Sequence, residues 1–137
     1  MRAAVERIAG VAGVSVRARS RVYETAPVGG PPQPSFLNAA IYAECILSPV
    51  ALLDELLAIE AALGRVRAAE TVRFGPRTID LDILWIEGVT LDEPRLVVPH
   101  PRLALRAFAL VPLLEVAPDA PYRAPHDPSV QATTLSL

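Results

Sequence analysis

The chain has 137 residues, a formal net charge of −2 and a hydrophobic fraction of 52%, which predicts a single folded domain with a buried core and argues against global disorder. The small net charge and the lack of any apolar run of about 18 residues give no reason to expect nucleic acid or a membrane as a partner. The single cysteine excludes an internal disulfide and argues against a structural zinc site.

The first predicted element is a helix over residues 2–9, which ends at Gly10. Residues 14–23 alternate apolar and polar side chains, as a strand does. Residues 27–34 are rich in proline and glycine, which admit neither helix nor strand ladder and therefore predict a loop. A second strand is expected over residues 36–47.

The most secure predicted helix follows this strand. Ser48 offers an N-cap and Pro49 suits the first helical position. An apolar stripe continues from there, and Gly64 is the expected residue just past the helix end. We expect residues 65–75 to form a mobile loop.

A strand is predicted over residues 79–85, with a short hairpin turn at Glu87 and Gly88. Residues 103–115 suggest a further helix, and the proline-rich tail after Ala117 is expected to be irregular. Strands and helices that do not alternate regularly favour an α+β fold with a mainly antiparallel sheet.

Two carboxylates lie in the strand predicted at 79–85. Asp80 and Asp82 alternate there with Ile79, Leu81 and Ile83, so the two acids share one face. Two such carboxylates repel each other, and a divalent cation between them relieves this; Mg²⁺ favours oxygen ligands that it shares with phosphates. The alternative is a pair of solvent-facing acids on an edge strand.

Arginine is the basic residue of this chain, because all 13 of its basic residues are arginine and none is lysine. A Walker A phosphate loop requires lysine, so that class is excluded. Guanidinium groups can instead bind phosphate oxygens in bidentate fashion. A cluster of them precedes the acid pair: Arg65, Arg67, Arg73 and Arg77. The alternative is a solvated loop with charges of no function.

Four ordered stretches of the chain are similar to one enzyme family. They are Tyr23–Gly29 with Phe36–Asn38, Ile59–Arg67, Arg73–Leu84, and Val98–Phe108 with Glu115–Asp119. These segments resemble the 6-hydroxymethyl-7,8-dihydropterin pyrophosphokinases of folate biosynthesis, over residues 3–119. The resemblance implies a ferredoxin-like core with helices on the sheet.

For the catalytic centre, the resemblance implies Mg²⁺-dependent transfer of the pyrophosphoryl group of ATP to the hydroxymethyl group of the pterin, with release of AMP. It implies that Asp80 and Asp82 hold two Mg²⁺ ions. It also implies that Arg67 and Arg77 grip the phosphates. No residue is an obvious general base for the attacking alcohol.

For the pterin, the resemblance implies a ring held between Phe36 and Phe108, with Asn38 at its edge. Thr25 and Val28 match loop positions that offer backbone hydrogen bonds. The residues alone would make Phe36 and Phe108 core residues. Asn38 lies two residues beyond Phe36, so both would project from the same strand face.

For the nucleotide, the resemblance implies a second set of side chains. The set is Glu60, Arg65, Arg73, Ile83, His100 and Arg106. Taken alone, His100 would be a structural histidine.

The chain differs from the family at its start. Family members begin with an apolar strand and a Gly-Ser-Asn loop before the first helix, whereas this sequence starts at about that helix. We therefore expect residues 1–137 to form an N-terminally truncated pyrophosphokinase domain. A non-catalytic pterin- or nucleotide-binding remnant and a Mg²⁺ nucleotide enzyme with another acceptor are the alternatives. The expected partners are ATP and a pterin alcohol, and the expected form is a cytoplasmic monomer.

Overall fold

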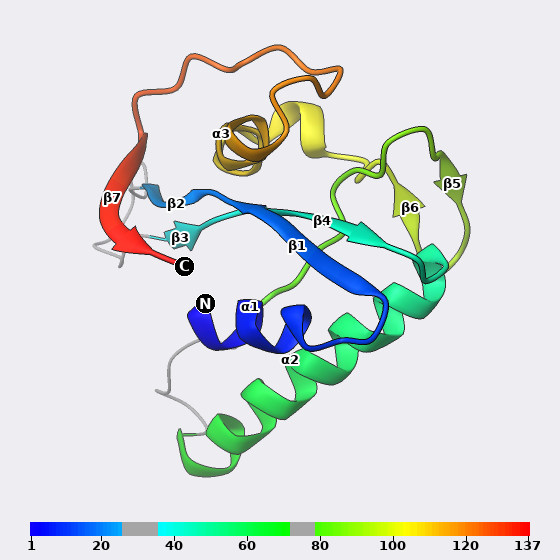
Figure 1. Ribbon diagram of the computed structural model, residues 1–137. Coiled ribbons are helices and arrows are strands. Elements are labelled where there is room, and N and C mark those ends of the chain that lie inside the picture. Colours follow the sequence, from blue (N-terminus) through cyan, green and yellow to red (C-terminus); the bar gives the residue numbers. More distant parts are fainter. Residues whose placement is uncertain (26–35, 72–78) are drawn as a thin grey trace. The chain divides into compact units, whose positions relative to one another are not determined.

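The computed structural model describes residues 1–25, 36–71 and 79–137, and side chains of residues 65–71 lie outside this description (Figure 1). The chain forms two compact units, Met1–Ser15 with Glu44–Pro99 and Val16–Ala43 with His100–Leu137. Helices and antiparallel strand pairs together confirm the predicted α+β class. In the described residues, no helix is both long enough and apolar enough to cross a bilayer.

Two helices pack together in the first unit. Helix α1 (Arg2–Ala9) confirms the helix predicted over residues 2–9, and it contacts the long helix α2 (Pro49–Thr71), as Figure 1 shows. Each helix turns an apolar face inward, which removes that surface from water. The buried apolar side chains of the two helices include Ala4, Val5, Ile8, Leu56 and Ile59.

Helix α2 begins as predicted but ends later. The Ser48 hydroxyl oxygen accepts the N–H of Ala51 at 3.2 Å, which satisfies one of the free donors of the first turn and confirms the N-cap. The predicted end at Gly64 is wrong, and so is the loop predicted from residue 65, because α2 continues to Thr71; the rest of that predicted loop lies outside the described residues. A glycine inside a helix costs only about 1 kcal/mol relative to alanine, and the residues after it are mostly good helix formers.

The segment from residue 79 to residue 86 is not a strand, which corrects the prediction for 79–85. The turn predicted at Glu87 and Gly88 is present, with Gly88 at a φ of +73°. The strand pair forms later, between β5 (Leu91–Asp92) and β6 (Val97–Val98), which are antiparallel. A strand requires a hydrogen-bonded neighbour, so alternation in the sequence alone did not decide it.

The second unit contains a three-stranded antiparallel sheet in the order β3-β2-β7. Its central strand is β2 (Arg21–Thr25), flanked by β3 (Phe36–Asn38) and β7 (Val130–Ser136), which lies beside β2 in Figure 1. The tail was expected to be irregular, and that prediction is wrong for β7. The hydroxyl of Thr133 donates to the carbonyl of Val22, which lies 111 residues earlier, so the pairing depends on a distant partner.

Each of the two long strands predicted near the N-terminal end is divided in two. Strand β1 (Val14–Arg19) pairs with β4 (Ile41–Cys45), and β2 pairs with β3. The breaks meet at Ser20 and Ala40: the Ser20 N–H donates to the Ala40 carbonyl at 2.9 Å, and the Ala40 N–H donates to the Ser20 hydroxyl at 2.8 Å. Ser20 is buried, and this exchange satisfies the polar groups at the break.

The helix predicted over residues 103–115 consists of two elements. A short 3₁₀ helix, η1 (Leu103–Leu105), precedes helix α3 (Ala107–Val116), and Arg106 separates them. Helix α3 contacts β2, β3 and β7, so it covers the sheet of the second unit. The core of this unit includes Leu103, Leu110, Pro112 and Leu113.

Candidate active site

The acid pair lies in the first unit, on the segment that follows the undescribed residues 72–78 and that forms neither helix nor strand up to residue 86. Exposure alternates there: Asp80 and Asp82 are exposed, whereas Ile79, Leu81 and Ile83 are half-buried. Both carboxylates are therefore exposed to solvent, although no strand ladder holds them, and their role in a metal site stays a prediction. Two adjacent carboxylates that face solvent are accessible to a cation and to a bound polyphosphate.

Glu60 ties this segment to helix α2. Its carboxylate oxygen Oε2 accepts the backbone N–H of Leu81 at 2.6 Å. Glu60 follows the buried Ile59 on α2, so its backbone is fixed by the packing of the helix. Because Leu81 stands between Asp80 and Asp82, this bond fixes the backbone of the acid pair.

A magnesium site made of this pair is chemically reasonable. In the described part of the chain, no three His, Cys, Asp or Glu side chains gather into a group that could hold a metal by themselves. Mg²⁺ is commonly bound through one or two carboxylates together with substrate phosphates and water, rather than by a cage of protein ligands. Asp80 and Asp82 fit that smaller donor set.

Three of the pterin candidates, Thr25, Phe36 and Asn38, lie in the second unit on one face of the β2–β3 pair. Tyr23 pairs with Asn38 and Thr25 pairs with Phe36, so all four side chains project to the same side of the sheet. Phe36 is 49% exposed, which leaves its ring open to a ligand. The Thr25 hydroxyl oxygen is buried and has no hydrogen-bond partner in the described residues, and such a group is rare unless a ligand or water completes it.

Helix α3 lies over the same face. The Tyr23 hydroxyl donates to Glu115 Oε1 at 2.5 Å, which places α3 on the side that Asn38 and Phe36 share. Phe108 precedes Glu115 by seven residues, about two turns, so both project from the same side of α3. The exposed ring of Phe108 therefore belongs to the same region as Phe36 and Asn38.

Arg21 completes a network with Tyr23 and Glu115. Its guanidinium donates to the Tyr23 hydroxyl at 3.0 Å and to Glu115 Oε1 at 3.3 Å, and its backbone N–H donates to Glu115 Oε2 at 3.1 Å. Burial, then the bond to Glu115, raises the pKa of Tyr23. Burial by itself would raise the pKa of Glu115, but the bonds from Tyr23 and Arg21 outweigh it and lower that pKa.

Two nucleotide candidates are positioned in the second unit. The guanidinium carbon of Arg106 lies 5.7 Å from the centre of the Phe108 ring, a cation–π distance. His100 Nδ1 accepts the backbone N–H of Arg102 at 3.2 Å. This bond assigns the proton of the neutral imidazole to Nε2, which can then donate to a phosphate oxygen.

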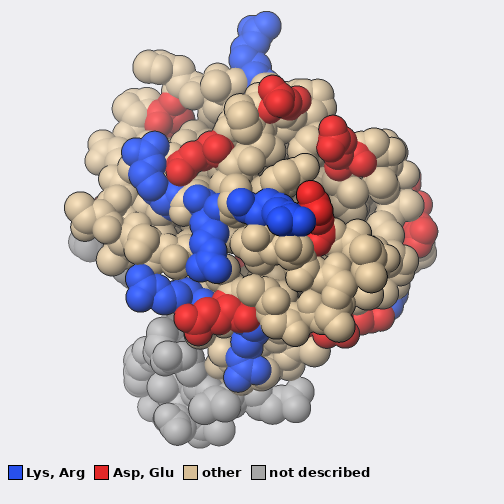
Figure 2. All heavy atoms as spheres, in the orientation of Figure 1, with Lys and Arg blue, Asp and Glu red and all other residues tan. Residues whose placement is uncertain are grey.

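Several predicted residues lie outside the description. Val28, Arg73 and Arg77 fall in the undescribed residues 26–35 and 72–78, and of Arg65 and Arg67 only the helical backbone is described. Blue side chains in Figure 2 are all arginines, since the chain has no lysine, and acidic side chains lie among them on the face shown.

The remaining candidates fall into two sets. Glu60, Asp80, Asp82 and Ile83 belong to the first unit, and the pterin candidates belong to the second unit together with His100 and Arg106. Sequence reasoning assigned no role to Arg21, Tyr23 or Glu115. The sequence signal that could have identified two of them is that Tyr23 and Glu115 each begin a segment that resembles the family.

Comparison with known proteins agrees with the sequence motifs. The sequence model of the family described as 7,8-dihydro-6-hydroxymethylpterin-pyrophosphokinase matches residues 1–118. The chain is 51% identical over 116 residues to a 2-amino-4-hydroxy-6-hydroxymethyldihydropteridine pyrophosphokinase of Methylorubrum extorquens, an alignment that covers 85% of this chain and 72% of the relative. An enzyme with the same name from Synechocystis is 42% identical, over 87% of this chain and 59% of the relative. One from Bacillus subtilis is 44% identical, over 85% of this chain and 68% of the relative. The chain therefore belongs to the 7,8-dihydro-6-hydroxymethylpterin-pyrophosphokinase family, enzymes that transfer a pyrophosphoryl group to hydroxymethyldihydropterin in folate synthesis.

Proposed function

We propose that this chain transfers the pyrophosphoryl group of ATP to 6-hydroxymethyl-7,8-dihydropterin, giving AMP and the pterin diphosphate, in a Mg²⁺-dependent reaction. Membership of the family supports the reaction. The structural observation that carries the proposal is the pair of exposed carboxylates, Asp80 and Asp82, on a segment fixed by Glu60. Such a pair has no structural use in the described contacts, and it suits a metal shared with phosphates.

In this proposal Asp80 and Asp82 are the ligands of two Mg²⁺ ions. When bound, Mg²⁺ neutralises the negative charge that develops on the triphosphate. Arg67 and Arg77 grip the phosphates through bidentate bonds, and Arg65 and Arg73 assist them. Of the other nucleotide candidates, His100 donates from Nε2 to a phosphate oxygen, and Arg106 supplies a further positive charge.

The second unit binds the pterin. Phe36 and Phe108 offer aromatic faces to a flat heteroaromatic ring, for which stacked or edge-on contacts are favourable. Asn38 supplies both a donor and an acceptor for the pterin edge. The Thr25 hydroxyl, which has no partner among the described residues, gains one when the ring is bound, and Val28 contributes a backbone contact. In this proposal the protein contributes to catalysis by aligning the pterin hydroxymethyl group with the ATP phosphorus atom that it attacks.

The test is AMP release from ATP, measured with and without the pterin and with Mg²⁺ or a chelator present. The proposal requires AMP that depends on both the pterin and Mg²⁺. An Asp80→Asn, Asp82→Asn double variant is the matched control, and it should release no AMP above background. A folded wild-type chain that binds the pterin and releases no AMP would instead be a non-catalytic binding protein.

A further inference from the structure

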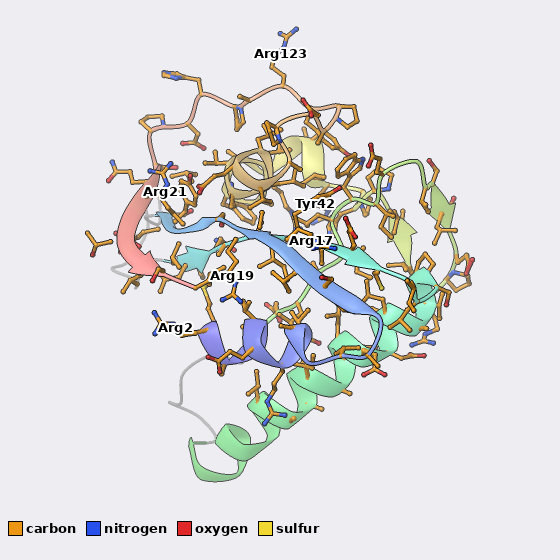
Figure 3. The ribbon with its side chains drawn as sticks, in the orientation of Figure 1. Arg2, Arg17, Arg19, Arg21, Tyr42 and Arg123 are labelled. Carbon is orange, nitrogen blue, oxygen red and sulfur yellow. The ribbon has the colours of Figure 1, made fainter. Side chains whose placement is uncertain are left out.

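The network of Arg21, Tyr23 and Glu115 joins the sheet of the second unit to helix α3. It contains a hydrogen bond from the buried Tyr23 hydroxyl to the Glu115 carboxylate, at 2.5 Å, and the Arg21 guanidinium donates to both partners. Arg21 lies at the start of β2, where Figure 3 labels it. Its side chain is 62% exposed and that of Glu115 is 29% exposed, so Tyr23 is the desolvated member.

Both ends of this network are adjacent to pterin candidates. On the sheet, Tyr23 is the cross-strand partner of Asn38, and Thr25 lies two residues further along the same face. On the helix, Glu115 projects from the same side as Phe108, about 10 Å along the axis. The Tyr23–Glu115 bond therefore connects the strand that sets Asn38 to the helix that carries Phe108.

We infer, on the basis of the proposed function, that Tyr23 and Glu115 are positioning residues for the pterin. Their bond fixes the distance and rotation of α3 over the β2–β3 face, and thereby sets Phe108 opposite Phe36 and Asn38. Neither residue touches the pterin in this scheme. Small errors in the spacing of two stacking rings lower the affinity for a ligand held between them. The Tyr23–Glu115 bond therefore affects pterin affinity through the position of Phe108.

A purely structural role has a different signature. If the bond only held the fold together, its loss would lower stability and leave the pterin affinity of the folded protein unchanged. If it positions Phe108, the affinity for the pterin falls while the affinity for ATP is retained. The Michaelis constants for the two substrates therefore separate the two roles.

The experiment compares Tyr23→Phe, Glu115→Gln and the double variant with wild type. Tyr23→Phe keeps the ring and removes only the hydroxyl, and Glu115→Gln keeps an acceptor but removes the charge. Asp54→Asn is the matched control, since it breaks the exposed Arg95–Asp54 ion pair of the other unit and touches no pterin candidate. All measurements are made below the unfolding transition of each variant, as established by circular dichroism.

We expect Tyr23→Phe to raise the KM for the pterin roughly tenfold, the equivalent of one lost hydrogen bond to a charged group, and to change the KM for ATP less than about twofold. The double variant should be no worse than Tyr23→Phe, because the bond that Glu115→Gln weakens is already absent once the Tyr23 hydroxyl is removed. Unchanged pterin KM in folded variants would overturn the inference, as would an equal rise for both substrates.

Calorimetric titration with 6-hydroxymethylpterin separates this inference from the proposed function. A wild-type chain that binds this probe without turnover refutes the catalytic proposal alone, and the Kd of the variants then tests positioning directly. Turnover in wild type with equal Kd in all variants refutes the positioning role alone. A wild-type chain that neither binds nor turns over refutes both.

Discussion

Glu60 and Leu81 are joined by a hydrogen bond of 2.6 Å between a side-chain carboxylate and a backbone N–H, in a segment that has no strand partner. An extended chain ordinarily holds its direction through a ladder of backbone bonds. Here the Glu60 carboxylate on α2 holds the backbone of Leu81, the residue between Asp80 and Asp82, in place of such a ladder. A charge-assisted bond of this kind is stronger than a neutral one, which suits a single point of attachment.

Replacement of Glu60 should therefore impair the acid pair without unfolding the protein. We expect Glu60→Ala to lower kcat about tenfold or more and to raise the Mg²⁺ concentration needed for half-maximal activity, because Asp80 and Asp82 lose their fixed spacing. Glu60→Gln keeps an acceptor and should retain most of the activity. Glu55→Ala, on the exposed side of the same helix, is the control for the loss of a negative charge. Equal Mg²⁺ dependence in wild type and Glu60→Ala would contradict this account.

Asp80→Asn and Asp82→Asn should separate activity from stability. Both side chains are exposed, so each substitution should change the free energy of unfolding by less than about 0.5 kcal/mol. On the proposed function, activity should fall roughly a hundredfold or more, since each substitution would remove a charged ligand of the proposed Mg²⁺ ions. Urea unfolding and AMP release measure the two quantities on the same preparations. Near-wild-type turnover in one of these variants would show that the substituted residue is not part of the active site.

Ser20→Ala should have the opposite profile. It leaves the half-buried Ala40 N–H without its acceptor, and the loss of a hydrogen bond of this kind costs about 0.5–1.5 kcal/mol. The free energy of unfolding in urea should fall by that amount. Ser15→Ala, at an exposed position of β1, is the control and should be nearly neutral. Equal stability of both variants would mean that the exchange between Ser20 and Ala40 is not what satisfies the break.

The dependence of stability on pH should report Glu115 and Tyr23. Glu115 has a pKa lowered from its usual 4.5, so its contribution is complete above about pH 4.5 and is lost as the pH falls through the lowered value. Tyr23 has a pKa raised from 10.0, so its contribution is complete below about pH 10 and is lost as the pH rises through the raised value. Urea unfolding across neutral and acidic pH should show Glu115→Gln less stable than wild type at neutral pH, with the difference shrinking as the pH falls below about 4.5. A difference that stays constant over this acidic range would contradict the assignment to this carboxylate.

Sequence reasoning succeeded where the deciding interaction is local. The Ser48 cap depends on an N–H only three residues away, and the alternating exposure around Asp80 and Asp82 depends on the backbone of a few residues. Family motifs supplied the pterin candidates, of which Thr25, Phe36 and Asn38 lie on one face of the β2–β3 pair; their role with the pterin stays a prediction.

It failed where the deciding partner is distant or where a weak local signal was overridden. Strand β7 was missed because its partner β2 lies more than a hundred residues earlier in the chain, as the 111-residue separation of Thr133 and Val22 shows. Gly64 did not end α2, because its cost is small against the helix formers that follow. The network of Tyr23 and Glu115 needs both β2 and α3 in place, and no spacing in the sequence indicates it.

The position of β7 also has a consequence for the edge of the three-stranded sheet. Strand β2 is hydrogen-bonded on both sides, by β3 and by β7, and the family match ends at residue 118, before β7 begins. Without residues 130–136 one side of β2 would present a row of open N–H and C=O groups, which is a template for self-association. Strand β7 satisfies those groups and itself becomes an edge of the sheet, so this edge is made of residues that resemblance to relatives would not have singled out.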